Sequence, residues 1–324
     1  MRRMLAGLAT SALMALPLAA QADYPDKPIT VVFPNQAGST YYTIALSVLH
    51  EIEDVVPQPM GIQAMPGAGT ATGSRHAIQQ PADGYTLLFI HEGVLQVSIL
   101  GMLGADASEV LEPLAEVVST SPTIWARADA PYDNLQELAA YAKANPGDIK
   151  AAMQTGAPAH VIMAAFAEAI GAGEGIRQVH VGGGGAGARA ALLAGDVDLI
   201  GDNPTGMAGM SEAGQVKALG VLNNTRDERI PNVATLQEQG FPPNANMGLH
   251  GYFWIRADAP QEVKNYWHKV LGDALSNPET VARLEDSLGL DIYYKGGQDL
   301  VDEVMGRYQD RARLMEKFGI KPAE

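Results

Sequence analysis

The chain contains no cysteine, and it is also poor in aromatic residues. Without cysteine we expect no disulfide, no thiolate nucleophile and no lipid attachment at the mature N-terminus. Basic residues are scarce as well: 22 lysines and arginines stand against 37 aspartates and glutamates, a formal net charge of −15. This balance argues against nucleic acid or an anionic membrane surface as a partner, because both carry negative charge.

Common motifs for catalysis and metal binding are missing. The seven histidines form no HExxH or comparable pair, and the chain has no GxSxG elbow and no Walker lysine. We therefore expect no metal, no cofactor and no catalytic residue. An exported hydrolase remains an alternative, with Ser39 as nucleophile and His91 or His160 as base.

Beyond the N-terminus, no apolar run is long enough to span a bilayer. At the N-terminus itself, Arg2 and Arg3 precede the apolar run 4–20, and Ala20-Gln21-Ala22 has the small-x-small pattern of a cleavage site. This combination predicts a secretory signal peptide that is cleaved after Ala22. We expect an exported, periplasmic protein that is not a lipoprotein.

Glycine is abundant, most densely in the segment 179–204, VHVGGGGAGARAALLAGDVDLIGDNP. The segment predicts a strand, a four-glycine junction, an alanine-rich helix and a second strand, which together form a βαβ unit. The unpaired amides at such a helix start favour an anion. The string also contains GxGxxG at Gly182, Gly184 and Gly187, but export argues against a dinucleotide, which is largely a cytoplasmic ligand.

The remaining chain repeats the alternation of strand, small polar loop and helix. Strands are expected at 29–34, 61–65, 86–90, 149–153, 216–222 and 248–256, and helices at 41–55, 134–144, 161–170, 234–239, 261–275, 278–289 and 297–319. Ser39 or Thr40 is the expected N-cap of the first helix. Asp133 is expected to cap the helix at 134–144, with Gln136 at the capping-box position.

This order of elements predicts an α/β protein with two lobes. The chain without its signal peptide, about 300 residues, is larger than a single core usually is. An extended stretch at 115–127 crosses between lobes near Pro122, and the strand at 248–256 returns. We expect domain 1 to comprise 23–124 and 246–324 and domain 2 to comprise 125–245, with a hinge that brings loops from both lobes to one cleft.

Polar loops at the ends of the strands are the candidate ligand contacts. The first loop is 35–40, and a later one at 154–160 belongs to the second lobe. His91 follows the strand at 86–90, where its side chain is expected to face the cleft. The alternative for His91 and Glu92, equally favoured, is that they cap the next helix. For His160 the alternative is a capping or packing role.

Several segments, in their shared order, resemble the periplasmic substrate-binding proteins of tripartite tricarboxylate transporters, the Bug family. They are YPDKPITVVFP with the AGST loop, MPGAGTATG, PADGYTLL, GGGGAGARAALLAGDVDLIGDN, VKALGVLNNTRDERIPNVATLQEQGFP and a C-terminal GIKP. The resemblance implies a Venus flytrap, the two-lobed periplasmic-binding-protein fold in which each lobe is a sheet flanked by helices. It also implies an organic carboxylate ligand that is passed to integral membrane permease subunits, and we expect a monomer.

The resemblance also implies which residues contact the ligand, the first loop holding one carboxylate and the second lobe contacting the distal part. In the first lobe these are Gln36, Ala37, Gly38, Ser39, Thr40, Tyr41, Tyr42 and, from its position, His91. In the second they are Thr155, Gly156, Ala157, His160, Gly183, Gly184 and Asp202.

Tyr42 stands where family members often carry an aspartate that would pair with a ligand ammonium. Its presence favours a carboxylate without an amino group, such as a di- or tricarboxylate or an aromatic acid flanked by Tyr41 or Tyr42. Packing at the helix start is the alternative role of the tyrosines. A sensor or binder of another small polar solute, such as an amino acid, is the alternative function.

Overall fold

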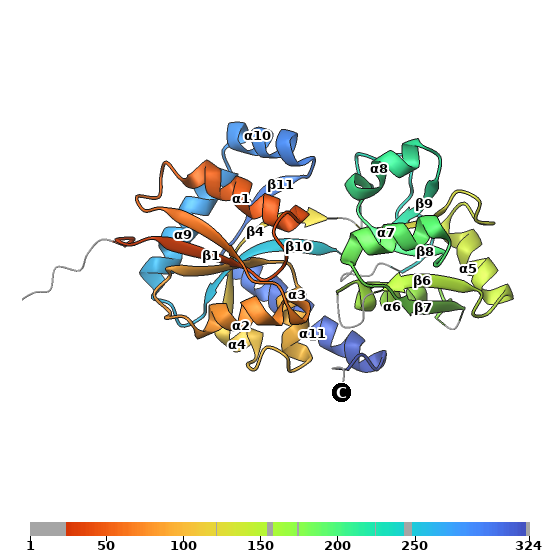
Figure 1. Ribbon diagram of the computed structural model, residues 1–324, viewed down its shortest axis with the longest axis horizontal. Helices are drawn as coiled ribbons and strands as arrows, with labels where there is room; N and C mark the ends of the chain where they lie inside the picture. Colours follow the sequence, from red (N-terminus) through yellow and green to blue (C-terminus); the bar gives the residue numbers. More distant parts are fainter. Residues whose placement is uncertain are drawn as a thin grey trace, which may run out of the picture.

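A computed structural model describes residues 24–120, 122–153, 158–173, 175–223, 225–242 and 248–321. The expected signal peptide and the predicted ligand residues Thr155, Gly156 and Ala157 therefore lie outside the described residues. The described chain forms two lobes side by side (Figure 1), each a sheet flanked by helices. Within these ranges, no helix is both long enough and apolar enough to cross a bilayer.

The sheet of the first lobe has the strand order β11-β4-β10-β3-β1-β2. Its strands are β1 (Ile29–Phe33), β2 (Met60–Ala64), β3 (Thr86–Ile90), β4 (Leu111–Thr120), β10 (Leu249–Arg256) and β11 (Ile292–Lys295). β1 pairs in parallel with β2 and β3, whereas β10 runs antiparallel to β3 and β4. The apolar run of β1 is almost wholly buried, as a strand covered on both faces requires.

Helices cover both faces of this sheet (Figure 1). They are α1 (Thr40–Ile52), α2 (Ala71–Gln79), α3 (Gly93–Ile99), α4 (Ala107–Val110), α9 (Gln261–Leu275), α10 (Pro278–Leu288) and α11 (Gln298–Lys317). In α9 the buried residues Val263, Trp267, Leu271 and Leu275 recur at helical spacing, so the helix predicted at 261–275 is confirmed and buries one apolar face.

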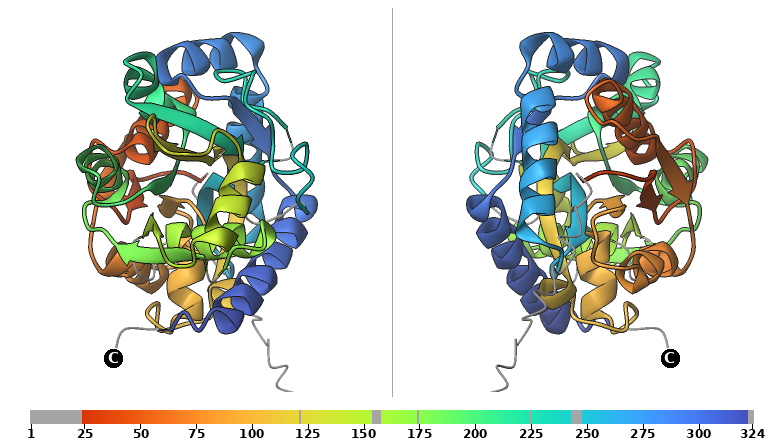
Figure 2. Two further views of the ribbon diagram at one scale, coloured as in Figure 1. Left: turned by 90° about the vertical axis from the view of Figure 1, so that its right-hand side faces the viewer. Right: turned by 90° about the vertical axis from the view of Figure 1, so that its left-hand side faces the viewer.

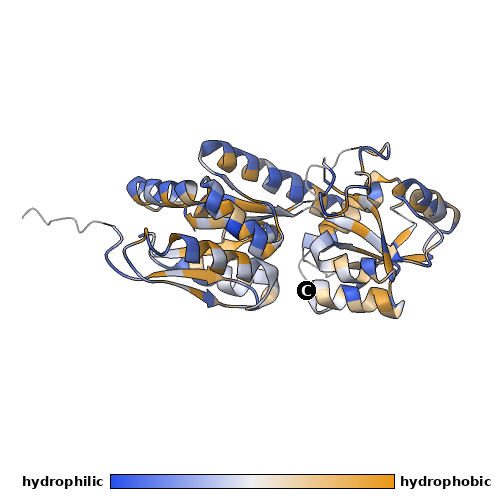
Figure 3. Ribbon diagram, turned by 90° about the horizontal axis from the view of Figure 1, so that it is seen from above, coloured by the Kyte–Doolittle hydropathy of each residue, from blue (hydrophilic) through white to orange (hydrophobic). Residues whose placement is uncertain are grey.

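The sheet of the second lobe has the order β7-β6-β8-β5-β9. It is built from β5 (Thr123–Arg127), β6 (Ile149–Met153), β7 (Ile176–His180), β8 (Leu199–Asp202) and β9 (Val216–Val221), with α5 (Leu135–Ala144), α6 (Pro158–Ala169), α7 (Gly184–Ala194) and α8 (Pro204–Glu212). β6 pairs in parallel with β7 and β8, and β5 runs antiparallel to its neighbours β8 and β9. Apolar strands lie inside both lobes (Figure 3).

The chain passes from the first sheet to the second between β4 and β5, and it returns along β10. The crossing lies at Pro122, where the sequence predicted it. The finer domain limits, after residues 124 and 245, remain a prediction.

Three local expectations differ from the structure. The N-cap of α5 is Asn134 and not Asp133, because the Asn134 side chain accepts a hydrogen bond from the amide of Glu137. Glu137, not Gln136, is the third residue of the helix after this N-cap, and its carboxylate accepts from the amide of Asp133, one residue before the N-cap. The helix expected at 234–239 is instead a bridge at Thr235 followed by turns.

The lobes also touch away from the strands that join them. The end of α11 packs against the second lobe, where Met315 and Ile320 share an apolar cluster with Leu100 of the first lobe and Val161 of α6. On another flank, the guanidinium of Arg229 donates to the carbonyl of Gly289 at 2.6 Å. In the end-on views of Figure 2, α10 and the dark-blue α11 lie towards opposite ends of the molecule.

Candidate ligand site between the lobes

The helices that follow parallel strands begin at one edge of each sheet. In the first lobe, β1, β2 and β3 lead into α1, α2 and α3, and in the second, β6, β7 and β8 lead into α6, α7 and α8. The carboxyl ends of parallel strands share an edge, so the amide-bearing helix starts gather there. Side chains from both edges line one cavity, so the two edges face each other.

This cavity has a volume of about 100 Å³. Its lining comes from both lobes and from the strands that join them. The lining residues of the first lobe and the crossing are Tyr41, Thr120, Pro122 and Leu249, and those of the second lobe are Ala152, Ala159, Ile162, Met163, Gly201, Asp202 and Asn203.

Of the two predicted tyrosines, Tyr41 lines the cavity and Tyr42 packs in the first lobe. The hydroxyl of Tyr41 donates to the carbonyl of Leu249 at 3.2 Å, and its ring meets the His91 ring edge-on with centroids 5.1 Å apart. Burial raises the pKa of Tyr41 above its ordinary value, so it stays neutral. Tyr42 instead sets its ring against Phe33, at 5.5 Å between centroids.

The first junction loop, between β1 and α1, is exposed and leads directly into α1. Gln36, Ala37 and Gly38 are exposed, and Gly38 has a φ of +81° with no described atom within 4 Å of where a Cβ would lie. Ser39, one of the two residues predicted as the N-cap, has this position, and its hydroxyl accepts a hydrogen bond from the amide of Tyr42 at 3.4 Å. Its hydroxyl thus has a structural role. Thr40 is the exposed first residue of the helix.

His91 and Glu92 follow β3, and their side chains have different roles. The Nδ1 of His91 accepts from the amide of Gly93 at 2.9 Å, so His91 caps α3, as the alternative interpretation expected. Burial lowers the pKa of His91 to about 4, which leaves the ring neutral near pH 7. The side chain of Glu92 makes no capping bond.

Glu92 instead belongs to a buried polar network. Its carboxylate accepts from the amide of His250 at 3.0 Å and from the hydroxyl of Tyr252 at 3.1 Å, and it lies 3.0 Å from Nδ1 of His250. Burial opposes ionisation of Glu92, but the charge and hydrogen bonds of His250 outweigh it and hold the pKa of Glu92 well below its ordinary value. Arg307 of α11 joins the network, 2.9 Å from Glu116.

In the second lobe, the glycine run forms the start of α7. Gly183 is the N-cap with a φ of +83°, and a Cβ on Gly182 or Gly184 would meet no described atom within 4 Å. Gly187 is different, because a Cβ there would lie 1.9 Å from the carbonyl oxygen of Gly182. The GxGxxG string therefore includes one glycine that the close backbone packing requires.

Asp202 lies at the end of β8 and lines the cavity, but its carboxylate already has partners. Arg189 of α7 donates to it at 2.6 Å, and the amide of Asn203 donates at 2.8 Å. Asn203 in turn caps α8 through the amide of Gly206. His160 is a half-buried residue in the first turn of α6, and burial lowers its pKa.

The predicted ligand set is therefore brought together in part. Tyr41 and Asp202 line the cavity from opposite lobes, and the first loop and the glycine run lie at the two facing edges. The sequence did not indicate Ile162, Met163 or Leu249, because such apolar residues look like core residues. Asn203 had one local signal, the Asn-Pro pair that commonly opens a helix.

Thr70 is a further residue at the junction edge that sequence reasoning left out. It is the N-cap of α2 with a φ of +94°, and its buried hydroxyl has no hydrogen-bond partner among the described residues. A strained backbone and an unsatisfied buried hydroxyl are typical of functional positions. The PGAGT string at this junction was the available signal.

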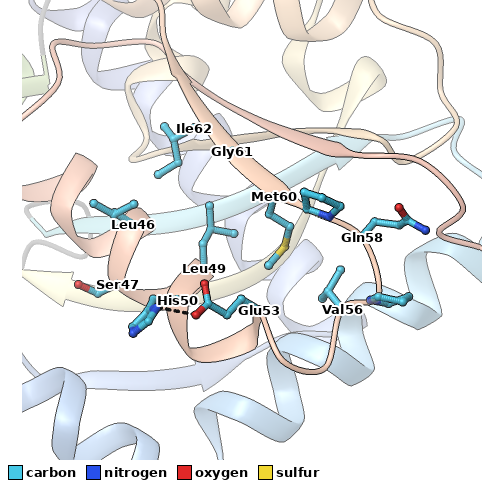
Figure 4. A pocket seen from close by; sticks show the side chains of 12 residues that line it. Leu46, Ser47, Leu49, His50, Glu53, Val56, Gln58, Met60, Gly61 and Ile62 are labelled. Carbon is cyan, nitrogen blue, oxygen red and sulfur yellow. Dashed lines mark ion pairs between the residues drawn. The ribbon is translucent and has the colours of Figure 1, made fainter.

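A larger hollow, about 820 Å³, lies elsewhere, between α1 and the edge strand β2 (Figure 4). Leu46, Leu49, Met60 and Ile62 line it, beside a His50–Glu53 ion pair at 3.0 Å. Its lining includes none of the described junction residues and no helix start. Across the described parts of the chain, no group of three or more histidines and carboxylates is placed to hold a metal ion.

The chain is similar to known proteins in sequence and in fold. The profile of the family described as "Tripartite tricarboxylate transporter family receptor" matches residues 44–320. A UPF0065 protein of Bordetella pertussis is 28% identical over 320 residues, covering 97% of each chain. The structure of periplasmic binding protein BugD is 26% identical with a TM-score of 0.73, covering 93% of this chain and all of that one.

Two further solved structures share the fold. Rpa4515 of R. palustris, solved with adipate, has a TM-score of 0.78 at 20% identity and covers 93% of this chain and 100% of its own. MatC of Rhodopseudomonas palustris, solved with bound malate, has a TM-score of 0.71 at 23% identity and covers 89% and 100%.

Proposed function

Because the chain belongs to the family of tripartite tricarboxylate transporter receptors, we propose that it captures an organic carboxylate between its lobes and delivers it to the membrane permease of such a transporter. The family consists of binding proteins and not of enzymes. Carboxylates are also the ligands named for two proteins of the same fold, adipate in one and malate in the other.

One observation carries the proposal: Tyr41, in the first turn of α1, and Asp202, which lies beside Gly185 at the start of α7, line one cavity from opposite lobes. Helix starts with their main-chain amides therefore lie on both sides of this cavity. Each helix start stabilises an anion by about 0.3–1 kcal/mol when exposed and by up to about 2 kcal/mol when partly buried. Charge-assisted hydrogen bonds add about 1.5–3 kcal/mol each. Micromolar affinity, about 8 kcal/mol, is within reach of a few such contacts after the costs of association.

The same proposal covers the ligand contacts and the location of the protein. We assign the carboxylate to the loop 36–40 and the distal part of the ligand to the second lobe. We further propose export through the N-terminal signal, cleavage after Ala22, and a monomer that moves freely in the periplasm. The lobes would then comprise 23–124 with 246–324, and 125–245.

Calorimetry on the chain that begins at Asp23 tests this function. Adipate, citrate, malate, benzoate and hexanoate are titrated, with adipamide as a neutral control of the same length as adipate. We expect at least one acid to bind with micromolar affinity and the diamide to show no heat of binding. Failure of every acid to bind, or binding of the diamide as tightly as adipate, would contradict the proposal.

A further inference from the structure

The wall of the cavity between the lobes is mostly apolar. Pro122 and Leu249 contribute from the crossing strands, and Ala152, Ile162 and Met163 contribute from the second lobe. Ile162 and Met163 are 4% and 2% exposed, so their side chains are fixed in this wall and do not reach solvent. An apolar wall stabilises hydrocarbon and offers no hydrogen bonds to a polar substituent.

Each polar side chain in the described lining already makes at least one hydrogen bond within the protein. The hydroxyls of Tyr41 and Thr120 both donate to the carbonyl of Leu249, at 3.2 and 3.0 Å. The side chain of Asn203 accepts from the amide of Gly206 at 2.8 Å. A ligand hydroxyl that entered this space would give up its bonds to water and would have to compete for these groups.

The charged group in the described lining is an acid. Asp202 is bound to Arg189 at 2.6 Å, and with side-chain exposures of 11% and 29% the two form a partly buried pair. The positive charge of Arg189 is therefore balanced in part by Asp202. The main-chain amides at the two edges remain the seats for a carboxylate, and the described wall between them, being mostly apolar, stabilises a hydroxyl or a further charge less well than water does.

We propose that the ligand is a carboxylate with a hydrocarbon body, aliphatic or aromatic, and that acids with hydroxylated bodies are rejected. This inference rests on the proposed function, because it takes the carboxylate at the edge amides as given. It goes beyond that function because it states which organic acids bind: those in which the part of the ligand that crosses the cavity is hydrocarbon.

Two matched pairs of acids test the selection by calorimetry on the unmodified protein. Adipate is compared with galactarate, its tetrahydroxy analogue, and hexanoate with gluconate, its pentahydroxy analogue. We expect the unhydroxylated acid of each pair to bind at least tenfold more tightly, which corresponds to about 1.4 kcal/mol.

The outcomes separate the two proposals. If galactarate, gluconate or citrate binds at least as tightly as adipate and hexanoate, the inferred hydrocarbon body of the ligand is wrong. The proposed function as a carboxylate receptor is then unaffected. If none of these acids and no benzoate binds, the proposed function fails instead.

A substitution in the wall adds an independent readout. Met163→Gln keeps the length of the side chain and places an amide in the wall. We expect it to reduce the adipate-to-galactarate affinity ratio at least threefold. Met210→Gln is the matched control, since Met210 packs on α8 outside the lining. An unchanged ratio in a folded Met163→Gln variant, with its melting temperature as the check of folding, would overturn the proposal.

Discussion

Gly38 is the residue on which the proposed anion seat of the first lobe most directly depends. Its φ of +81° turns the loop between β1 and α1, and a Cβ would meet no described atom within 4 Å. A side chain is therefore opposed by the backbone conformation and not by a clash, at about 1–2 kcal/mol. The loop has to move to relieve that strain, and the amides that it presents move with it.

We predict that Gly38→Val lowers the affinity for the carboxylate at least tenfold, while the free energy of unfolding falls by no more than about 2 kcal/mol. Calorimetry and urea denaturation measure the two quantities. Gly104→Val is the matched control, because Gly104 has a φ of +79° and equally open surroundings, but lies in the loop before α4. Equal losses of affinity in both variants would contradict the role of the first loop.

His91 gives a pH dependence with a definite sign. Its pKa is lowered from 6.5 to about 4 in the folded protein, because burial disfavours the charged ring. Between these values the unfolded chain binds the proton and the folded one does not, so the free energy of unfolding falls as the pH drops from 6.5 towards 4. The full effect is at most about 3 kcal/mol, at 1.36 kcal/mol for each pKa unit.

We predict that His91→Asn flattens this dependence, since asparagine keeps an acceptor for the amide of Gly93 but does not titrate. Urea denaturation at pH 7, 5.5 and 4.5 gives the difference between variant and wild type. His50→Asn, at an exposed position on α1, is the control. A difference between His91→Asn and wild type that stays constant across this range would refute the assignment.

Sequence patterns predicted best those elements whose own apolar side chains determine which face is buried. β1 is a continuous apolar run and is buried, and α9 has one apolar face and buries that face. The segment 234–239 had helical spacing too, but Gln239 bonds across to the amide of Leu135 and the carbonyl of Leu219. Such tertiary hydrogen bonds override a local preference and leave no trace in the spacing.

The candidate site shows the same limit. The small polar loops pointed to the two edges, because glycine and a capping residue are local signals. The sequence did not indicate the residues of the cavity wall, because Ile162 and Met163 lie within the apolar run of α6 and look like ordinary core residues. The α8 helix was missed, since glycines at 206 and 209 weaken its helical pattern.

The helix α11 carries the clearest long-range dependence. Its residue Arg307 lies 2.9 Å from Glu116 of β4 and 3.9 Å from Glu92, both of which are buried, and it also bonds to Tyr252 of β10. The helix therefore neutralises buried acids from separate parts of the first lobe. From the sequence alone, Arg307 is indistinguishable from the exposed arginines of the same helix.

We predict that Arg307→Met destabilises the protein by about 3–5 kcal/mol, because it leaves the buried carboxylate of Glu116 without its cation. Arg313→Met, on the same helix but with an exposed side chain paired to Asp310, should cost at most about 1 kcal/mol. Urea denaturation compares the two. Similar small losses in both variants would mean that the Glu92 and Glu116 carboxylates do not depend on Arg307.

Considered as a whole, the molecule is two lobes whose relative position is held by more than the crossing strands. The end of α11 is one such contact: Lys317 pairs with Glu168 of α6, and Phe318 lines a hollow together with residues that end α6. A receptor that closes on a ligand must change contacts of this kind, because they are the contacts between lobes. Their strength therefore sets how freely the lobes move without ligand.

We predict that the double variant Lys317→Ala/Phe318→Ala broadens the distribution of distances between the lobes in the ligand-free protein, because it removes an ion pair and an apolar contact from one flank. The absence of cysteine allows spin labels to be placed cleanly at Asp54→Cys and Gln215→Cys, exposed positions of the first and second lobe. Electron–electron double resonance measures the distribution. Lys269→Ala, whose ion pair with Asp273 lies within α9, should leave it unchanged. If the double variant matches this control, the end of α11 does not restrain the lobes, and the crossing strands alone position them.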